Sequence, residues 1–136
     1  MRDTPSHIYR KDTFKMMKNS SGISGEQLTA KMLADKGYDI VAMNYHSRFG
    51  EIDIIAENNE YIIFVEVKTR NDKSIAEAKE FVDAKKQKKI ILTAMQYLSL
   101  NETEKQPRFD VVEVYIKSKF GFHLKEINHI ENAFDA

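Results

Sequence analysis

One segment, residues 50–70, most constrains how this chain can fold. Two runs rich in β-branched and aromatic residues, 51–56 and 61–68, flank a polar Glu-Asn-Asn-Glu turn, whose asparagines tolerate the left-handed backbone of a tight hairpin. Side chains alternate across a strand, so one face of the second run carries Ile62, Phe64, Glu66 and Lys68. The segment therefore predicts a β-hairpin with an acid and a base at the end of an otherwise apolar face.

The pairing register decides whether Asp53 joins Glu66. With an even loop and no bulge, odd positions of the first strand face even positions of the second, so Glu51 and Asp53 lie on the Glu66 face. A two-residue loop at positions 59–60 sets Asp53 directly opposite Glu66, whereas a four-residue loop, or a two-residue loop at positions 58–59, makes them diagonal neighbours. Opposed carboxylates destabilise a hairpin unless positive charge lies between them. We therefore expect a hard divalent cation here, with Lys68 beside it.

The length and composition of the chain limit its class. A chain of 136 residues fits one domain of ordinary size. It has no cysteine, which excludes disulfides and thiolate metal sites and makes a cytoplasmic location the expectation. No apolar run reaches membrane-spanning length, so we expect no membrane partner. Its 21 basic and 21 acidic residues cancel, and this balance counts mildly against a general nucleic-acid binder.

The first helix is predicted after a polar tail at residues 1–20, at the start of a single domain over residues 21–134. Ser24 and Gln27 fit a capping box, and Gly37 fits a C-terminal stop. Glu26 leans toward the apolar side of this helix. It complements the helix dipole in one interpretation, and in the other it is a third carboxylate aimed at the hairpin face.

The remaining elements follow from periodicity. Strands are predicted at residues 38–45, 108–116 and 122–130, with a tail at 131–136, while residues 75–82 are ambiguous between loop and short helix. Asp83 is a good N-cap for a helix over residues 84–100, whose apolar positions include Ile91, Ala94, Met95 and Leu98. For Asp110, inside an apolar run, we expect a structural role with the Arg108 region or neighbouring backbone.

A basic cluster opens the second helix and consists of Lys85, Lys86, Lys88 and Lys89, with Gln87 among them. Cations at a helix N-terminus oppose its dipole, each at a cost of about 0.3–1 kcal/mol at low salt. A bound anion would offset this cost, although a solvated lysine face is an equally simple interpretation. Arg48 lies in the loop before the hairpin and is a weaker candidate for phosphate contact.

The order of these residues resembles that of a known nuclease group. Asp53 followed by Glu66-Val67-Lys68 resembles the motif of the PD-(D/E)xK nuclease superfamily. Ile52 occupies the position of the proline in that motif. The sequence motifs at residues 25–26, 50–53, 64–70 and 108–112 resemble the bacterial YraN-like family even more closely. This is an uncharacterised group similar to archaeal Holliday junction resolvases.

The resemblance implies an α/β fold with a restriction-endonuclease-like core. Its central sheet would be mixed, with about five strands flanked by helices in the order helix-strand-strand-strand-helix-strand-strand. It also implies an Mg²⁺- or Mn²⁺-dependent endonuclease, with one or two ions, that hydrolyses phosphodiester bonds in branched or junction DNA, as a homodimer. The implied site has Asp53, Glu66 and the Val67 carbonyl as metal ligands, Glu26 as a further ligand, and Lys68 orienting the attacking water.

Two alternatives remain open at this stage. The chain is a nucleic-acid-binding or adaptor module that keeps the fold without useful catalysis, or Glu66 and Lys68 form a structural ion pair that needs no metal. Basic residues 85–89 and Arg48 serve nucleic-acid binding in either the nuclease or the binding module.

Overall fold

The computed structural model of the chain describes residues 24–71, 82–117 and 123–136. Its elements, in chain order, are α2 (Gly25–Asp35), β1 (Asp39–Ser47), β2 (Gly50–Glu57), β3 (Tyr61–Asn71), α3 (Ala84–Leu100), β4 (Gln106–Lys117) and β5 (His123–Phe134). This is the predicted order, and the α/β fold with a mixed sheet is confirmed. The predicted tail at residues 1–20 and most of the ambiguous segment at 75–82 lie outside the described residues.

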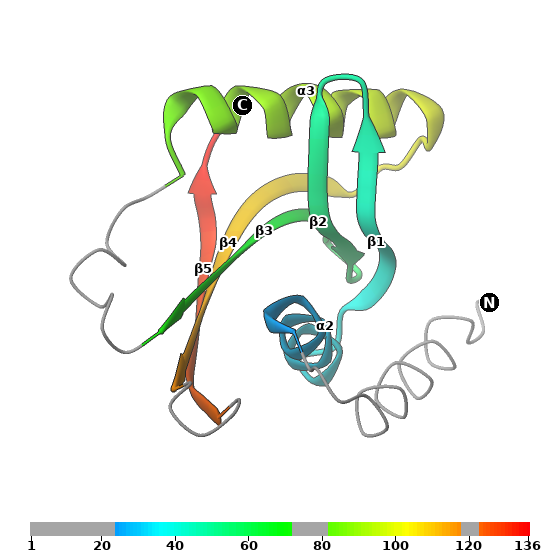
Figure 1. Cartoon of the computed structure of the whole chain (residues 1–136). Helices are drawn as coiled ribbons and strands as arrows, with labels where there is room; N and C mark the ends of the chain where they lie inside the picture. The colour runs from blue at the N-terminus through cyan, green and yellow to red at the C-terminus, as the bar shows by residue number, and fades with distance from the viewer. Residues whose placement is uncertain (1–23, 72–81, 118–122) are drawn as a thin grey trace.

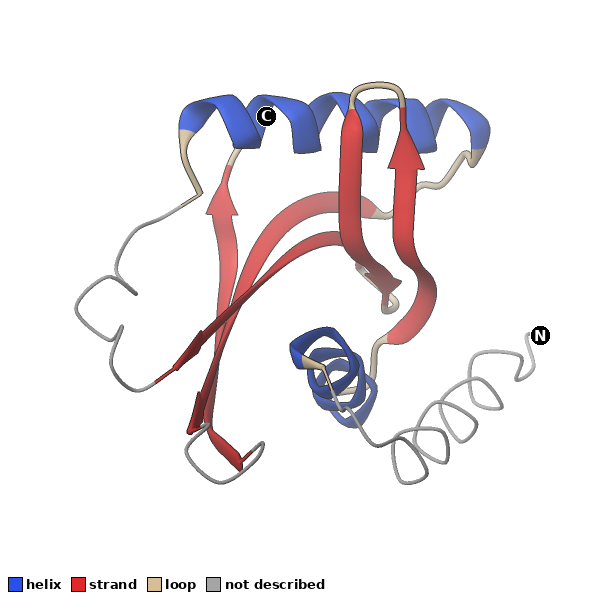
Figure 2. Ribbon diagram, in the orientation of Figure 1, coloured by secondary structure: helices blue, strands red, loops and turns tan. Residues whose placement is uncertain are grey.

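The five strands form one sheet in the order β1-β2-β3-β4-β5. Neighbours are antiparallel except β3 and β4, which are parallel because the chain between them crosses over through α3. The two helices cover opposite faces of this curved sheet, as Figures 1 and 2 show. No helix of the described residues is long and apolar enough to cross a membrane.

The α2 face of the sheet is closed by a helix whose ends are those predicted. Ser24 Oγ accepts a hydrogen bond from the Gln27 N–H (3.1 Å), and Gln27 Oε1 accepts one from the Ser24 N–H (2.9 Å). Gly37 adopts a φ of 98°, and its N–H donates to the Ala34 carbonyl. The helix then buries Ala30 and Leu33 against Ile54, Ile63, Val65 and Val112.

The α3 face differs from the prediction in its helical phase. Asp83 caps the helix through the Lys86 N–H (2.8 Å) as predicted, and the bounds 84–100 are confirmed. The side chains buried against the sheet are Ile90, Thr93, Ala94 and Tyr97. Met95, predicted to be apolar contact, is 59% exposed, because Tyr97 packs edge-on to the rings of Tyr45 and Phe64 and sets the helix rotation.

The last strand is longer than predicted. The sequence indicates a strand ending at Ile130 and a tail beyond it, but β5 continues to Phe134. The Phe134 ring stacks on Phe109 with centroids 5.2 Å apart, and the Asn132 N–H donates to Asp110 Oδ1 (3.0 Å). Both contacts join residues distant in sequence, so local periodicity does not indicate them.

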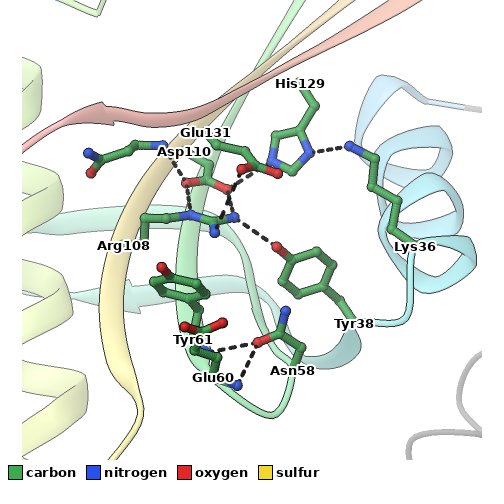
Figure 3. A network of polar contacts seen from close by, with 10 residues as sticks. Lys36, Tyr38, Asn58, Glu60, Tyr61, Arg108, Asp110, His129 and Glu131 are labelled. Carbon is green, nitrogen blue, oxygen red and sulfur yellow. Dashed lines mark hydrogen bonds and ion pairs between the residues drawn. The ribbon is translucent and has the colours of Figure 1, made fainter.

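Asp110 has the structural role expected of it. Its fully buried carboxylate accepts two hydrogen bonds from Arg108, at 2.9 and 2.8 Å, and lies 2.8 Å from His129 Nε2 (Figure 3). Lys36 Nζ lies 2.8 Å from the other ring nitrogen of His129, and Arg108 also donates to Tyr38. This network ties the end of α2 to β4 and β5.

Candidate active site

Asp53 and Glu66 are brought together by the hairpin of β2 and β3. The register pairs Ile54 with Val65 and Glu57 with Ile62, which is the two-residue-loop arrangement. Continued by one residue, it sets Asp53 opposite Glu66. Asp53 Oδ2 also accepts a hydrogen bond from the Val67 N–H (2.8 Å), so its side chain is held on the Glu66 side of the hairpin.

The surroundings of Glu66 disfavour its charged form. Burial, and after it the Asp53 charge, raises the pKa of Glu66 to about 7, although Lys86 and Lys68 act in the opposite direction. Only 7% of Glu66 is exposed. At neutral pH the folded protein thus holds a carboxyl group whose ionised form lacks sufficient positive charge around it.

Asp53 shows the same imbalance. Burial raises its pKa, the Val67 N–H opposes the rise, and the nearby Glu51 charge adds to it. Glu51 was placed on this face by parity but was not among the predicted site residues. Its position two residues before Asp53 in an alternating strand was the available signal.

Glu26 reaches the site because a glycine precedes it. A Cβ on Gly25 would lie 2.1 Å from Thr69 Oγ1, so only glycine lets the first turn of α2 approach β3 this closely. The Glu26 carboxyl is within hydrogen-bonding reach of Asp53 and Asn44, and burial, followed by the Asp53 charge, raises its pKa. Of the two interpretations of Glu26, the geometry favours a third carboxylate at the hairpin face.

Two lysines flank Glu66 from different elements. Lys68 follows it by two residues on the same strand face, and its charge lowers the Glu66 pKa. Lys86 approaches from α3, with its Nζ 3.7 Å from Glu66 Oε2. The sequence interpretation assigned Lys86 only to the nucleic-acid-binding cluster, and the structure adds this ion pair with a candidate metal ligand.

The residues of the predicted basic cluster, 85–89, do not all face the same cleft. Lys86 and Lys89 line a cleft of about 420 Å³, whereas the Gln87 amide turns away from it and donates to the Val82 carbonyl (2.8 Å). Lys85 and Lys88 are exposed and do not line the cleft. Only part of the cluster therefore faces the carboxylates.

The cleft adjoins the candidate metal ligands. Its lining comprises His46, Ser47, Arg48, Phe49, Gly50, Glu51, Asp53, Lys86 and Lys89. The Arg48 guanidinium lies over the Phe49 ring, 5.0 Å from its centroid, so this predicted phosphate contact forms part of the wall. His46 lies 3.6 Å from Glu51 at the rim. The cleft thus combines cations and an aromatic ring with the carboxylates of Glu51 and Asp53.

The donor set fits a hard cation with few protein ligands. Carboxylate oxygens of Asp53 and Glu66 and a backbone carbonyl are donors that Mg²⁺ and Mn²⁺ accept, with water completing the coordination. The part of the chain that the structure describes contains no group of three or more His, Asp or Glu side chains arranged to hold a metal by themselves. The fit therefore rests on two carboxylates and Val67, with Glu26 behind them.

The family model and the relatives described below all belong to one protein family. The family model described as uncharacterised protein family UPF0102 matches residues 25–114. A UPF0102 protein of Caldanaerobacter subterraneus subsp. tengcongensis is 43% identical over 121 residues, covering 88% of this chain and 98% of that protein. A UPF0102 protein of Alkaliphilus oremlandii is 46% identical over 121 residues, covering 87% and 100%. The match spans every candidate site residue.

Proposed function

We propose that this chain, which belongs to the uncharacterised protein family UPF0102, is a metal-dependent endonuclease that hydrolyses phosphodiester bonds in DNA. The resemblance to the YraN-like family is confirmed by this membership. Family membership carries no named activity, so the proposal rests on the site. The observation that supports it most is the pairing of half-buried Asp53 with buried Glu66, beside Lys68 and a cleft lined by Lys86 and Lys89.

The ligands of the proposed cation come from two strands. Asp53 and Glu66 supply carboxylate oxygens. The N–H and C=O of one residue point to the same side of a strand, so the Val67 carbonyl lies on the side where its N–H meets Asp53. Glu26 is the further ligand, directly or through water. One or two Mg²⁺ or Mn²⁺ ions would lower the pKa of the attacking water and stabilise charge on the phosphoryl oxygens.

The protein side chains supply the rest of the chemistry. Lys68 orients the attacking water and balances negative charge that develops in the transition state. Lys86 and Lys89 hold the phosphodiester backbone in the cleft, and Arg48, which also lines it, contacts phosphate. Branched or junction DNA is the proposed substrate and a homodimer the proposed working form, because a junction presents paired strands.

The decisive experiment measures Mg²⁺- or Mn²⁺-dependent cleavage of a panel of branched and linear DNAs. Asp53→Asn and Lys68→Ala are expected to lose cleavage. Asp35→Asn, at an exposed carboxylate paired with Lys31 on α2, is the matched control and should cleave as the wild type does. Equal cleavage by all variants would overturn the proposal, since a contaminating nuclease would then explain the activity.

A second candidate function is a binding or adaptor module that performs no catalysis. The 3.7 Å contact between Lys86 and Glu66 favours it, because a lysine supplies positive charge to the carboxylates without a metal. This module would bind DNA with strong salt dependence and leave it intact in the same assay. Cleavage that disappears in Asp53→Asn rejects it.

A further inference from the structure

At Asp53 the alternation of β2 side chains between the two sides of the sheet is interrupted. Ile54 and Ala56 pack in the core on the α2 side, whereas Ile52 and Ile55 pack in the core on the α3 side. A straight strand would keep Ile52 and Ile54 on one face, since side chains alternate. The strand therefore rotates about its axis between Ile52 and Ile54.

The same change occurs on β1, at Asn44. Met43 packs toward the α2 side and Tyr45 toward the α3 side. Asn44 between them has a φ of 53°, a left-handed backbone that asparagine tolerates better than most residues. The pairs Met43 with Ile54 and Tyr45 with Ile52 place Asn44 opposite Asp53. Both strands thus rotate at one cross-strand position.

This rotation turns the outer half of the β1–β2 hairpin onto α3. The Tyr45 hydroxyl donates to Gln96 Oε1, and Ser47 Oγ lies 2.9 Å from Thr93 Oγ1. A Cβ on Gly50 would lie 3.3 Å from Lys89 Cβ, which shows how closely the hairpin approaches the helix. Figure 1 shows the hairpin rising to the level of α3. The hairpin wall of the cleft stands in place because of this contact.

The side chain of Asn44 makes a second connection. It lies within hydrogen-bonding reach of the Glu26 carboxyl, which is itself within reach of Asp53. Asn44 is therefore joined to the site twice, through its backbone to the hairpin wall and through its amide to the third carboxylate. Nothing in its sequence context signals this role, because it stands within a predicted strand.

We propose that Asn44 is the positioning residue of the candidate metal site. Its amide holds the Glu26 carboxyl against Asp53, and its left-handed backbone turns the hairpin over α3 so that the cleft closes beside the carboxylates. The first role rests on the proposed function, because it supposes that a cation binds there. The second concerns only the fold of the hairpin.

The amide role is tested with Asn44→Gly, which keeps the left-handed backbone and removes the side chain. Calorimetric titration with Mn²⁺ alone should show about 10-fold weaker binding than in the wild type, a loss typical when a partner that orients a ligand is removed. Asn132→Gly is the matched control, because Asn132 also has a φ of 53° but lies by Asp110. It should bind Mn²⁺ as the wild type does, and Asn44→Gly binding equally tightly would overturn the amide role.

The backbone role is tested with Asn44→Ala, since alanine resists the left-handed conformation. Amide hydrogen exchange at residues 45–51 should be at least about 10-fold faster in Asn44→Ala than in Asn44→Gly, because a strained backbone opens more readily. Equal exchange in the two variants would overturn this role. A wild type that binds no Mn²⁺ overturns the amide role together with the metal part of the proposed function, and the exchange comparison still decides the backbone role.

Discussion

The Asp53 carboxylate accepts a 2.8 Å hydrogen bond from the backbone N–H of Val67. Asp53 therefore has a structural role in addition to its proposed role in metal binding. Two substitutions distinguish these roles. An asparagine at this position could still accept the bond through its side-chain oxygen, whereas an alanine could not.

We expect Asp53→Ala to lower the free energy of unfolding by about 1–2 kcal/mol, because the Val67 N–H loses its partner. Asp53→Asn should keep the wild-type stability or exceed it in a chelating buffer, because it removes a charge whose burial is unfavourable. We expect Mn²⁺ to raise the melting temperature of the wild type, and both variants should lose this rise. Urea denaturation and thermal scans measure these effects, and an Asp53→Asn variant that Mn²⁺ still stabilises would contradict metal binding by Asp53.

Glu66 predicts an unusual pH dependence. Its folded-state pKa is about 7 against the ordinary 4.5, so between these values the folded protein binds its proton more tightly than the unfolded chain does. Stability should therefore increase as pH falls from about 8 to about 5, on the order of 2 kcal/mol after discounting for solvent. Urea denaturation with EDTA at several pH values measures it. Glu66→Gln should show a flatter profile, and an unchanged profile would refute the assignment.

For Asp110 we expect the opposite change of stability with pH. Burial alone would raise its pKa, but hydrogen bonds from Arg108, His129 and Asn132 hold it below the ordinary value. Its stabilising contribution is thus complete above pH 3.8 and is lost as pH falls through the lowered folded-state pKa. Asp110→Asn should cost about 3 kcal/mol at neutral pH, because it leaves Arg108 without its main counter-charge. Asp35→Asn, in an exposed pair, should cost less than about 0.5 kcal/mol in the same urea assay.

The absence of a side chain at Gly25 allows α2 to pack closely against Thr69 of β3. Gly25→Ala places a methyl group 2.1 Å from Thr69 Oγ1, so α2 or the Thr69 side chain must shift, at a cost of about 1–3 kcal/mol. Thr69→Ala removes that oxygen and should recover most of the loss in the double variant, because the remaining distance to the Thr69 Cβ is 3.4 Å. A double-mutant cycle of unfolding free energies measures the coupling. Strictly additive losses would show that the contact is not the cause.

The division of the lysine cluster predicts unequal effects on DNA binding. Lys89→Ala, within the cleft, should weaken DNA affinity and reduce the slope of log affinity against log salt by about one. Lys31→Ala, on the helix that covers the opposite sheet face, should leave the slope unchanged. Fluorescence anisotropy over a salt series measures both. Equal slopes in the two variants would place the DNA elsewhere.

Much of the fold follows from local pattern. The capping box at Ser24, the Asp83 cap and the hairpin register of β2 with β3 each depend on neighbours in sequence, and each is confirmed. The extension of β5 and the rotation of α3 depend on contacts of Phe134 and Tyr97 with distant rings, so sequence periodicity misses them.

The candidate site was likewise predicted in part. Parity brings Asp53 and Glu66 together, and the helix phase directs Glu26 toward them. The ion pair of Lys86 with Glu66 was missed because it depends on how α3 lies over the sheet. The face change at Asn44 was missed because a left-handed residue inside a strand leaves no mark in an alternating pattern.

The antiparallel joining of β2 to β3 and the parallel joining of β3 to β4 imply an order of assembly. Asp53 and Glu66 meet through a short-range turn, whereas Lys86 arrives with α3 only when a long crossover has closed. Short-range contacts form faster than long-range ones, so we expect the acidic half of the site to form before its lysine partner is in place. For that interval we expect the hairpin to hold its carboxylates together without the α3 cation, so the divalent cation that we propose for this site should speed folding itself.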